Sequence, residues 1–428
     1  MKIKTVSSRT YHLGRVYFNR LRQFEPNARL YLVSVVLTGA AMGIYNLLFN
    51  FFVLSLGHNE AYIGKLVSLN HASIIVMALF SAVLMRKVKR KWVLFGGIAM
   101  AVVSVVMMLF VPEKWVILGM SALFGGSQCL INISIAPLLM ESSGEEERTY
   151  LFSTAFALQM AAMFGGNWAG GRLPGWLMGA GLAVDVESGY KIALLVMAGL
   201  TLLGMIPVLR MQVQPLQINE NPDMVSWPEM LKQSRKMGKL VTPVLLTSLG
   251  AGLIMPFMNV YFRHIYHQTD EMIGLVFAFG SLAMGLGMVA APPLAERFGK
   301  VQLFTLSRGL SLPFLVLLGT SPWFGLAAMA YNVRIMLMNM AGPVYQNFVM
   351  EEVDPGMRPV ASSMLTVGGS LGWGISSLIS GWLQVNYGFG PAFVWAGIGY
   401  MLGVVSTWWF FLRQPRVIKP QHVPVIGD

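Results

Sequence analysis

Residues 93–111, VLFGGIAMAVVSVVMMLFV, form an apolar run without a single charge. A helix needs about 20 such residues to cross a bilayer, whereas the strands of an outer-membrane barrel alternate apolar and polar residues. Similar runs recur along the chain, and only 12% of its residues are charged, against roughly a quarter in soluble proteins. The sequence therefore predicts an all-α membrane protein and excludes a soluble enzyme.

We expect about twelve membrane-spanning helices in two six-helix halves. The first six spans are predicted at 30–56, 63–85, 92–111, 115–140, 150–171 and 190–209. The second six are predicted at 241–262, 272–294, 301–319, 323–350, 359–385 and 391–412. The halves are thus 30–209 and 241–412, and they are flanked by a basic N-terminal segment (1–29), a polar linker (210–240) and a tail (413–428).

The net charge of +12 follows the loops. Lys and Arg gather in the segments 1–29, 86–91 and 210–240, and the alternate loops hold few. Because Lys and Arg accumulate on the cytoplasmic side, both termini are predicted to be cytoplasmic in a multi-pass plasma-membrane protein. Attraction to anionic lipid heads explains the remaining basic charge, so no nucleic-acid partner is expected.

The single cysteine, Cys129, lies inside an apolar run. It excludes an intrachain disulfide framework and a cysteine-based zinc site. The sequence contains no metal-ligand cluster and no phosphate-cradling Walker pattern. We therefore expect no cofactor, no metal site and no ATP-driven step.

An internal repeat recurs at a constant offset of 210 positions. Glu351 follows Glu141, and Arg358 follows Arg148, by that offset. The pairs Ile63-Gly64 with Ile273-Gly274, Ser153 with Ser363, and Gly171 with Gly381 share it. Each match falls at the same point in the helix order, so the chain is interpreted as two halves duplicated in parallel.

On this repeat and its loops, the sequence resembles the major facilitator superfamily of transporters over nearly its whole length. The family's loop motif after the eighth span is matched by Leu294, Glu296, Arg297, Gly299 and Lys300. After the second span only the basic tail remains, with Arg86 where the family has an acid. The fifth span carries Ala162-x-x-x-Gly166-Asn167-x-x-Gly170-Gly171, a variant of a pattern seen in drug exporters. Small residues at this spacing also serve plain helix packing.

The resemblance implies a substrate site near the midplane, lined by the first, fourth, seventh and tenth spans. Polar residues at depth in those spans are the candidate substrate-binding residues. They are Asn46, Asn50, Gln128, Asn132, Asn259, Asn339 and Arg334. The alternative for each amide is an interhelical hydrogen bond without a substrate role.

Arg334 lies near the centre of the tenth span. A central arginine costs on the order of 3 kcal/mol on insertion scales, so it should face the bundle interior or water. Subtracting 210 places Arg334 and Met338 on Phe124 and Gln128, so Arg334 is expected on the cavity face. Asn339 is then expected on a different face of the helix. Arg308, near one end of the ninth span, is expected to snorkel to the interface.

Candidates for gating and coupling lie mostly at span ends. We expect two ion pairs between the halves, Glu141 with Arg358 and Glu351 with Arg148, by the symmetry of the repeat. Glu296 and Arg297 belong to the loop motif, and His71 in the second span is a candidate for proton handling. All Asp and Glu residues fall in loops or at span ends. A deep carboxylate of the kind that trades a proton for a cation is therefore absent.

These features predict a monomeric secondary transporter that works by alternating access on a small organic solute. An anionic or amphiphilic solute is favoured by a central arginine without a central acid. The fifth-span pattern favours export, and coupling to protons or another ion is left open. The alternatives are an uptake symporter of an organic anion, a lipid or lysolipid flippase, and a non-transporting membrane receptor or scaffold.

Overall fold

The computed structural model describes the backbone of residues 25–141, 145–211 and 227–413. All regular structure in these ranges is helical. Nine of the helices are long and apolar enough to cross a membrane. Three further passes (α6, α12 with α13, and α14) bring the described part of the chain to the expected twelve.

The first half is an antiparallel bundle of six helices. They are α2 (Pro26–Ser55), α3 (Glu60–Lys87), α4 (Arg90–Phe110), α5 (Lys114–Glu141), α6 (Glu145–Gly179) and α7 (Val186–Arg210). Side chains fix where some of them begin. Asn59 accepts a hydrogen bond from the Tyr62 amide at the start of α3, and Asp185 with Ser188 forms a capping box at α7.

The second half contains six passes, two of them broken. Its helices are α8 (Trp227–Ile254), α9 (Met258–Tyr266), α10 (Asp270–Phe298), α11 (Lys300–Thr320), α12 (Phe324–Met340), α13 (Gly342–Glu352), α14 (Arg358–Tyr387) and α15 (Gly390–Thr407). A 3₁₀ turn, Met255–Phe257, separates α8 from α9, and a π turn, Trp408–Leu412, ends α15.

The spans predicted at 241–262 and 323–350 are thus each built from two helices. Pro256 sits in the first break and Pro343 just after the second. Proline has no amide hydrogen and clashes with the preceding turn, so each interrupts its helix. In addition, α8 starts at Trp227, so helix extends into residues expected to form the linker.

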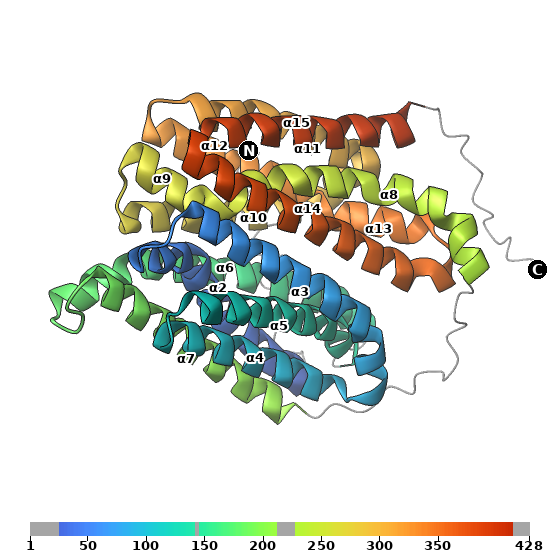
Figure 1. Ribbon diagram of the computed structural model, residues 1–428. Helices are drawn as coiled ribbons and strands as arrows, with labels where there is room; N and C mark the ends of the chain where they lie inside the picture. Colours follow the sequence, from blue (N-terminus) through green and yellow to red (C-terminus); the bar gives the residue numbers. More distant parts are fainter. Residues whose placement is uncertain (1–24, 142–144, 212–226, 414–428) are drawn as a thin grey trace, which may run out of the picture.

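The two halves lie side by side, and α7 ends at the same end of the molecule at which α8 starts (Figure 1). We call this end the linker side, since α7 ends there and α8 starts there. The opposite end, with the α2–α3 and α9–α10 turns, is the far side. The linker side is the predicted cytoplasmic side.

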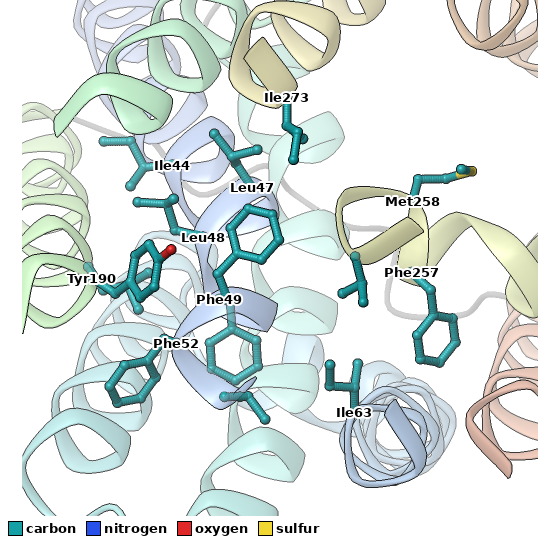
Figure 2. Close-up of a cluster of buried hydrophobic side chains, with 14 of the residues drawn as sticks. Ile44, Leu47, Leu48, Phe49, Phe52, Ile63, Tyr190, Phe257, Met258 and Ile273 are labelled. Atoms are coloured by element: carbon teal, nitrogen blue, oxygen red, sulfur yellow. The ribbon is translucent and has the colours of Figure 1, made fainter. Parts of the chain in front are cut away.

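Apolar cores join the halves at the far side. One buried cluster takes Leu47 and Phe52 from α2, Tyr190 from α7, and Met258 and Ile273 from the second half (Figure 2). Toward the linker side the described clusters are separate, one within each half. Since burial of shared apolar surface holds elements together, the halves are closed on each other at the far side.

Four repeat-related glycines make the closest approaches between the halves. A Cβ on Gly171 of α6 would lie 2.6 Å from the Asp270 carbonyl oxygen and 3.1 Å from the Gly274 Cα of α10. A Cβ on Gly64 of α3 would lie 2.5 Å from the Ser377 carbonyl oxygen and 3.3 Å from the Gly381 Cα of α14. The offset of 210 relates these two crossings to each other. The fifth-span glycines therefore serve helix packing, part of it across the halves.

Replacing Gly171 with alanine should cost about 1–3 kcal/mol of stability, because its Cβ meets backbone that must shift. Gly165 in the same helix has open space within 4 Å of its Cβ position. Gly165→Ala should therefore be neutral or stabilise by about 0.5–1 kcal/mol. Thermal unfolding of the two purified variants checks this. Equal melting temperatures of the Gly171→Ala and Gly165→Ala proteins would contradict close packing at this crossing.

Candidate functional site

A cavity of about 640 Å³ lies between the two halves. Its walls come from α2, α3, α5 and α6 of the first half and from α8 through α12, α14 and α15 of the second. Among the described residues that line it, none is Asp or Glu. Two of these lining residues are arginines, and both belong to the second half.

Arg334 of α12 forms part of the cavity wall, although none of its surface is exposed (0%). Its Nη1 donates to the Met255 sulfur at 3.4 Å, and its Cζ lies 4.8 Å from the centre of the Tyr400 ring. Its Nε and Nη2 find no acceptor among the described residues. Arg334 is thus a buried cation without a counter-ion, covered by a flexible methionine.

Arg308 of α11 also lines this cavity, so the prediction that it snorkels to the interface is wrong. Its Nη1 donates to Thr247 Oγ1 at 2.8 Å, and its Cζ lies 3.7 Å from the centre of the Phe304 ring. Its Nε has no acceptor among the described residues. The aromatic stacking turns the guanidinium inward and stabilises it there.

The first half contributes neutral polar groups. Asn46, a predicted substrate-binding residue, is exposed and lines the cavity. Asn167 of α6 donates through Nδ2 to Ser281 Oγ at 3.1 Å, and its Oδ1 has no donor in the described chain. His71 of α3 lies 5.4 Å, ring to ring, from Trp373 of α14, and its Nδ1 is buried without a partner among the described residues.

Asn50 and Asn259, both predicted site residues, line the cavity at its far-side end and bond to each other across the halves. Asn50 Nδ2 donates to Asn259 Oδ1 at 2.9 Å and to the Pro256 carbonyl at 2.6 Å. Asn259 Nδ2 donates to the Leu47 carbonyl at 2.7 Å. Pro256 follows Met255, which covers Arg334. The break between α8 and α9 therefore links the arginine to the contact between the halves.

Asn339 was expected on a different face of the helix from Arg334, yet it too lines the central cavity. Both residues line the same cavity, because the wall formed by α12 is broad and includes Tyr331, Ile335 and Met338. The Asn339 Nδ2 donates to the Ile335 carbonyl of its own helix at 2.8 Å.

Gln128 and Asn132, two of the predicted substrate-binding residues, both belong to α5 but divide between two cavities. Gln128 lines the central cavity and also a smaller one of about 280 Å³ inside the first half. Asn132 lines only the smaller one. We call this smaller cavity the side chamber.

A polar network closes the far side. Tyr190 of α7 donates to Asp270 Oδ2 at 2.6 Å, and Arg263 Nη2 donates to the Tyr190 hydroxyl at 2.8 Å. Arg263 also pairs with Asp270, and its Cζ lies 3.4 Å from the centre of the Phe51 ring. We call Tyr190, Arg263 and Asp270 the far-side latch. Beside it, Arg172 pairs with Glu271 at 2.5 Å.

The predicted gating residues lie at the linker side. Glu351 pairs with Lys300, and Arg358 Nε donates to the Met350 carbonyl at 2.9 Å, both within the second half. Glu296 borders an open hollow with Lys300, and the Arg297 Cζ lies 5.4 Å from the Phe298 ring centre. The side chains of Glu141 and Arg148 lie outside the described residues, so the two proposed ion pairs stay predictions.

The predicted site did not include Arg308, Asn167, Tyr400 or the far-side latch. Arg308 carried one usable signal, a charge more than two turns inside an apolar span. The latch residues lie at span ends, where charged and aromatic residues are common. Their sequence positions therefore did not indicate a role in closing the far side.

The sequence model of the Major Facilitator Superfamily matches this chain twice, over residues 31–241 and 240–425. The multidrug resistance protein MdtG of Yersinia enterocolitica is 30% identical over 215 residues, which are 47% of this chain and 48% of that protein. The match thus spans about half the length of that relative.

Solved structures share the fold. The nucleoside transporter NupG superposes with a TM-score of 0.72 at 15% identity, over 90% of this chain and 99% of that one. FucP, a transporter of the same superfamily in an outward conformation, gives 0.62 at 12% identity, over 89% and 98%. At these identities the likeness extends to the fold alone.

Proposed function

The chain belongs to the major facilitator superfamily of membrane transporters, and from that premise we propose that it carries a small organic anion, with export as the favoured direction. It acts as a multi-pass plasma-membrane protein and is not an enzyme. The candidate substrate-binding residues are Arg334 and Arg308. Their neutral polar neighbours in the cavity wall are Asn46, Asn50, Gln128, Asn259 and Asn339.

One observation is the main support for an anionic substrate. Three guanidinium N–H groups, Nε of Arg308 and both Nε and Nη2 of Arg334, lack an acceptor among the described residues. No carboxylate stands among the described lining residues to neutralise them. An unpaired buried charge is costly, and charge-assisted hydrogen bonds are strong. An entering carboxylate or similar anion would satisfy these donors.

Transport by alternating access requires that substrate binding change the contact between the two halves. Polar bonds and an apolar cluster join the halves at the far side, so we expect the solute to enter from the linker side. An anion that also binds Nη1 of Arg334 would displace Met255 from it. Since Pro256 next to it holds Asn50, this displacement would loosen the contact between the halves. A ligand shifts the conformations only through such a difference in contacts.

Export is supported by the fifth-span pattern and by the partial likeness to a multidrug resistance protein. Uptake of an organic anion with a proton is the second candidate, favoured by His71. His71 lines the cavity, and a protonated imidazole there would be stabilised by a bound anion. A lipid flippase would need lateral access for tails, and a receptor would have no need of unpaired guanidinium groups.

Matched ligand pairs test the anionic substrate. The purified protein is melted with aromatic carboxylates and with amines of equal size, such as benzoate against benzylamine. Carboxylates are expected to raise the melting temperature, by about 2.7 kcal/mol of stabilisation at a hundredfold excess over Kd. The binding carboxylate should then exchange across proteoliposomes. Stabilisation by amines alone would overturn the proposal.

A further inference from the structure

The side chamber lies within the first half and is lined by residues of α2, α4, α5, α6 and α7. It shares a wall with the central cavity, because Met42, Phe124 and Gln128 line both. Met42 and Gln128 are flexible side chains, and rotation of either would join the two spaces. The chamber is therefore reachable from the central cavity without unfolding of a helix.

The polar groups of the chamber divide into committed and free ones. The hydroxyls of Ser34, Thr38 and Thr201 donate to the carbonyls of Gly204, Ser34 and Met197. The side chains of Gln128, Asn132 and Gln159 make no hydrogen bond within the described chain. Asn132 is exposed, and Gln128 and Gln159 are partly exposed, so these amides are free to hydrogen-bond a ligand that enters the chamber.

The chamber carries no charge among its described lining residues, and most of its wall is apolar, from Leu94, Ile98, Ala101, Phe156 and Met197. It differs in this from the central cavity with its two arginines. A charged group would lose its hydration there without compensation. An uncharged ring that carries a hydroxyl or carbonyl would instead bury apolar surface and satisfy the free amides.

The volume of the side chamber limits the size of the ligand group that it can hold. A cavity of about 150 Å³ accommodates benzene. The chamber measures about 280 Å³, so it has room for a fused bicyclic group with one polar substituent. It has no room for a long lipid chain and its headgroup together.

We propose that the side chamber is a second subsite, which takes the uncharged bicyclic end of a substrate whose anionic end binds Arg308 and Arg334. This inference depends on the proposed anionic substrate and narrows it to elongated amphiphilic anions with a hydrogen-bonding ring. Gln159 and Asn132 then act as specificity residues for the ring.

Binding of a graded probe series tests the subsite. The probes are ω-(6-hydroxy-2-naphthyl)alkanoates of increasing chain length, with the unsubstituted naphthyl acids and the plain alkanoates as references. At the length that spans the two cavities, the hydroxynaphthyl acid should bind at least about tenfold more tightly than the plain alkanoate, from the apolar area that it buries.

Two variants assign this gain to the chamber. Ala155 lines the chamber and is buried, and Ala155→Phe should abolish the gain by filling it. Ala157 lies on the same helix and is exposed, so Ala157→Phe is the matched control and should retain the gain. Gln159→Leu keeps the volume, and should cost the hydroxynaphthyl acid about fivefold or more while leaving the unsubstituted naphthyl acid unchanged.

The outcomes separate the two proposals. If plain carboxylates bind but the ring adds nothing, or if Ala155→Phe keeps the gain, the subsite is overturned and the anion site stands. If no carboxylate binds in any form, the proposed function itself fails. Should Ala155→Phe not fold, Gln159→Leu decides, since equal losses for both naphthyl acids would overturn the subsite.

Discussion

Replacing Arg334 with methionine is expected to abolish anion binding while raising the stability of the unliganded protein. The two effects have one cause. Arg334 is fully buried (0% exposed), and its Nε and Nη2 have no acceptor among the described residues. Without substrate these donors destabilise the fold; with an anion bound they become its strongest contacts.

The two expected effects of Arg334→Met are opposite: anion binding becomes weaker, whereas the unliganded protein becomes more stable. Hydrogen bonds to charged groups contribute about 1.5–3 kcal/mol each, so the loss of two should weaken anion binding by about a hundredfold or more. A charge near the membrane centre costs about 3 kcal/mol on insertion scales, so Arg334→Met should stabilise the unliganded protein by about 1–3 kcal/mol. Thermal unfolding with and without the binding carboxylate measures both.

Two further variants distinguish a substrate site from a structural charge. Arg334→Lys keeps the charge but loses the planar fork, so it should bind the anion weakly and gain no stability. Met255→Ala uncovers the guanidinium and should tighten anion binding. If Arg334→Met lowers the melting temperature and leaves anion affinity unchanged, Arg334 is a structural residue.

The family, the all-helical fold and the division into two halves could be predicted because long apolar runs admit few structures. The repeat also identified packing positions. It pairs Gly64 with Gly274 and Gly171 with Gly381, and all four glycines lie at the two crossings between the halves. Which glycine meets which could not be predicted, because the offset relates positions within each half and not contacts between them.

The candidate site was predicted in part. Arg334 stands out by its depth in a span, and the cost of a deep charge gives it a direction. Arg308 was placed wrongly because its depth alone allowed snorkelling; only the stacking on Phe304 and the bond to Thr247 show that it turns inward. Asn132 was predicted to bind substrate together with Gln128, yet helical spacing cannot tell which of two cavities a residue enters.

Tyr190→Phe should open the far side. The hydroxyl of Tyr190 links the first half to both Asp270 and Arg263 of the second, and the tyrosine is buried (2% exposed). Its removal leaves the Arg263–Asp270 pair intact within the second half. The variant therefore removes the hydrogen bonds of this one hydroxyl between the halves and little else.

The population shift follows from the lost bonds. Hydrogen bonds to charged partners contribute about 1.5–3 kcal/mol, which corresponds to about a tenfold to hundredfold shift toward the conformation open at the far side. Glu271→Gln is the matched control. Glu271 neighbours Asp270, but its pair with Arg172 is half exposed (51% at Glu271), so its loss should shift the equilibrium by no more than about 1 kcal/mol.

Spin labels at Val184→Cys and Thr320→Cys, both exposed at the far side of opposite halves, report the opening. The buried Cys129 is replaced by alanine in every form. Tyr190→Phe should add a population with a longer distance, which Glu271→Gln should not. A saturating anion that satisfies Arg334 should act in the same direction, since it displaces Met255 beside the Pro256–Asn50 bond. If Tyr190→Phe leaves the distances unchanged while Glu271→Gln alters them, the exposed pair and not the latch holds the far side closed.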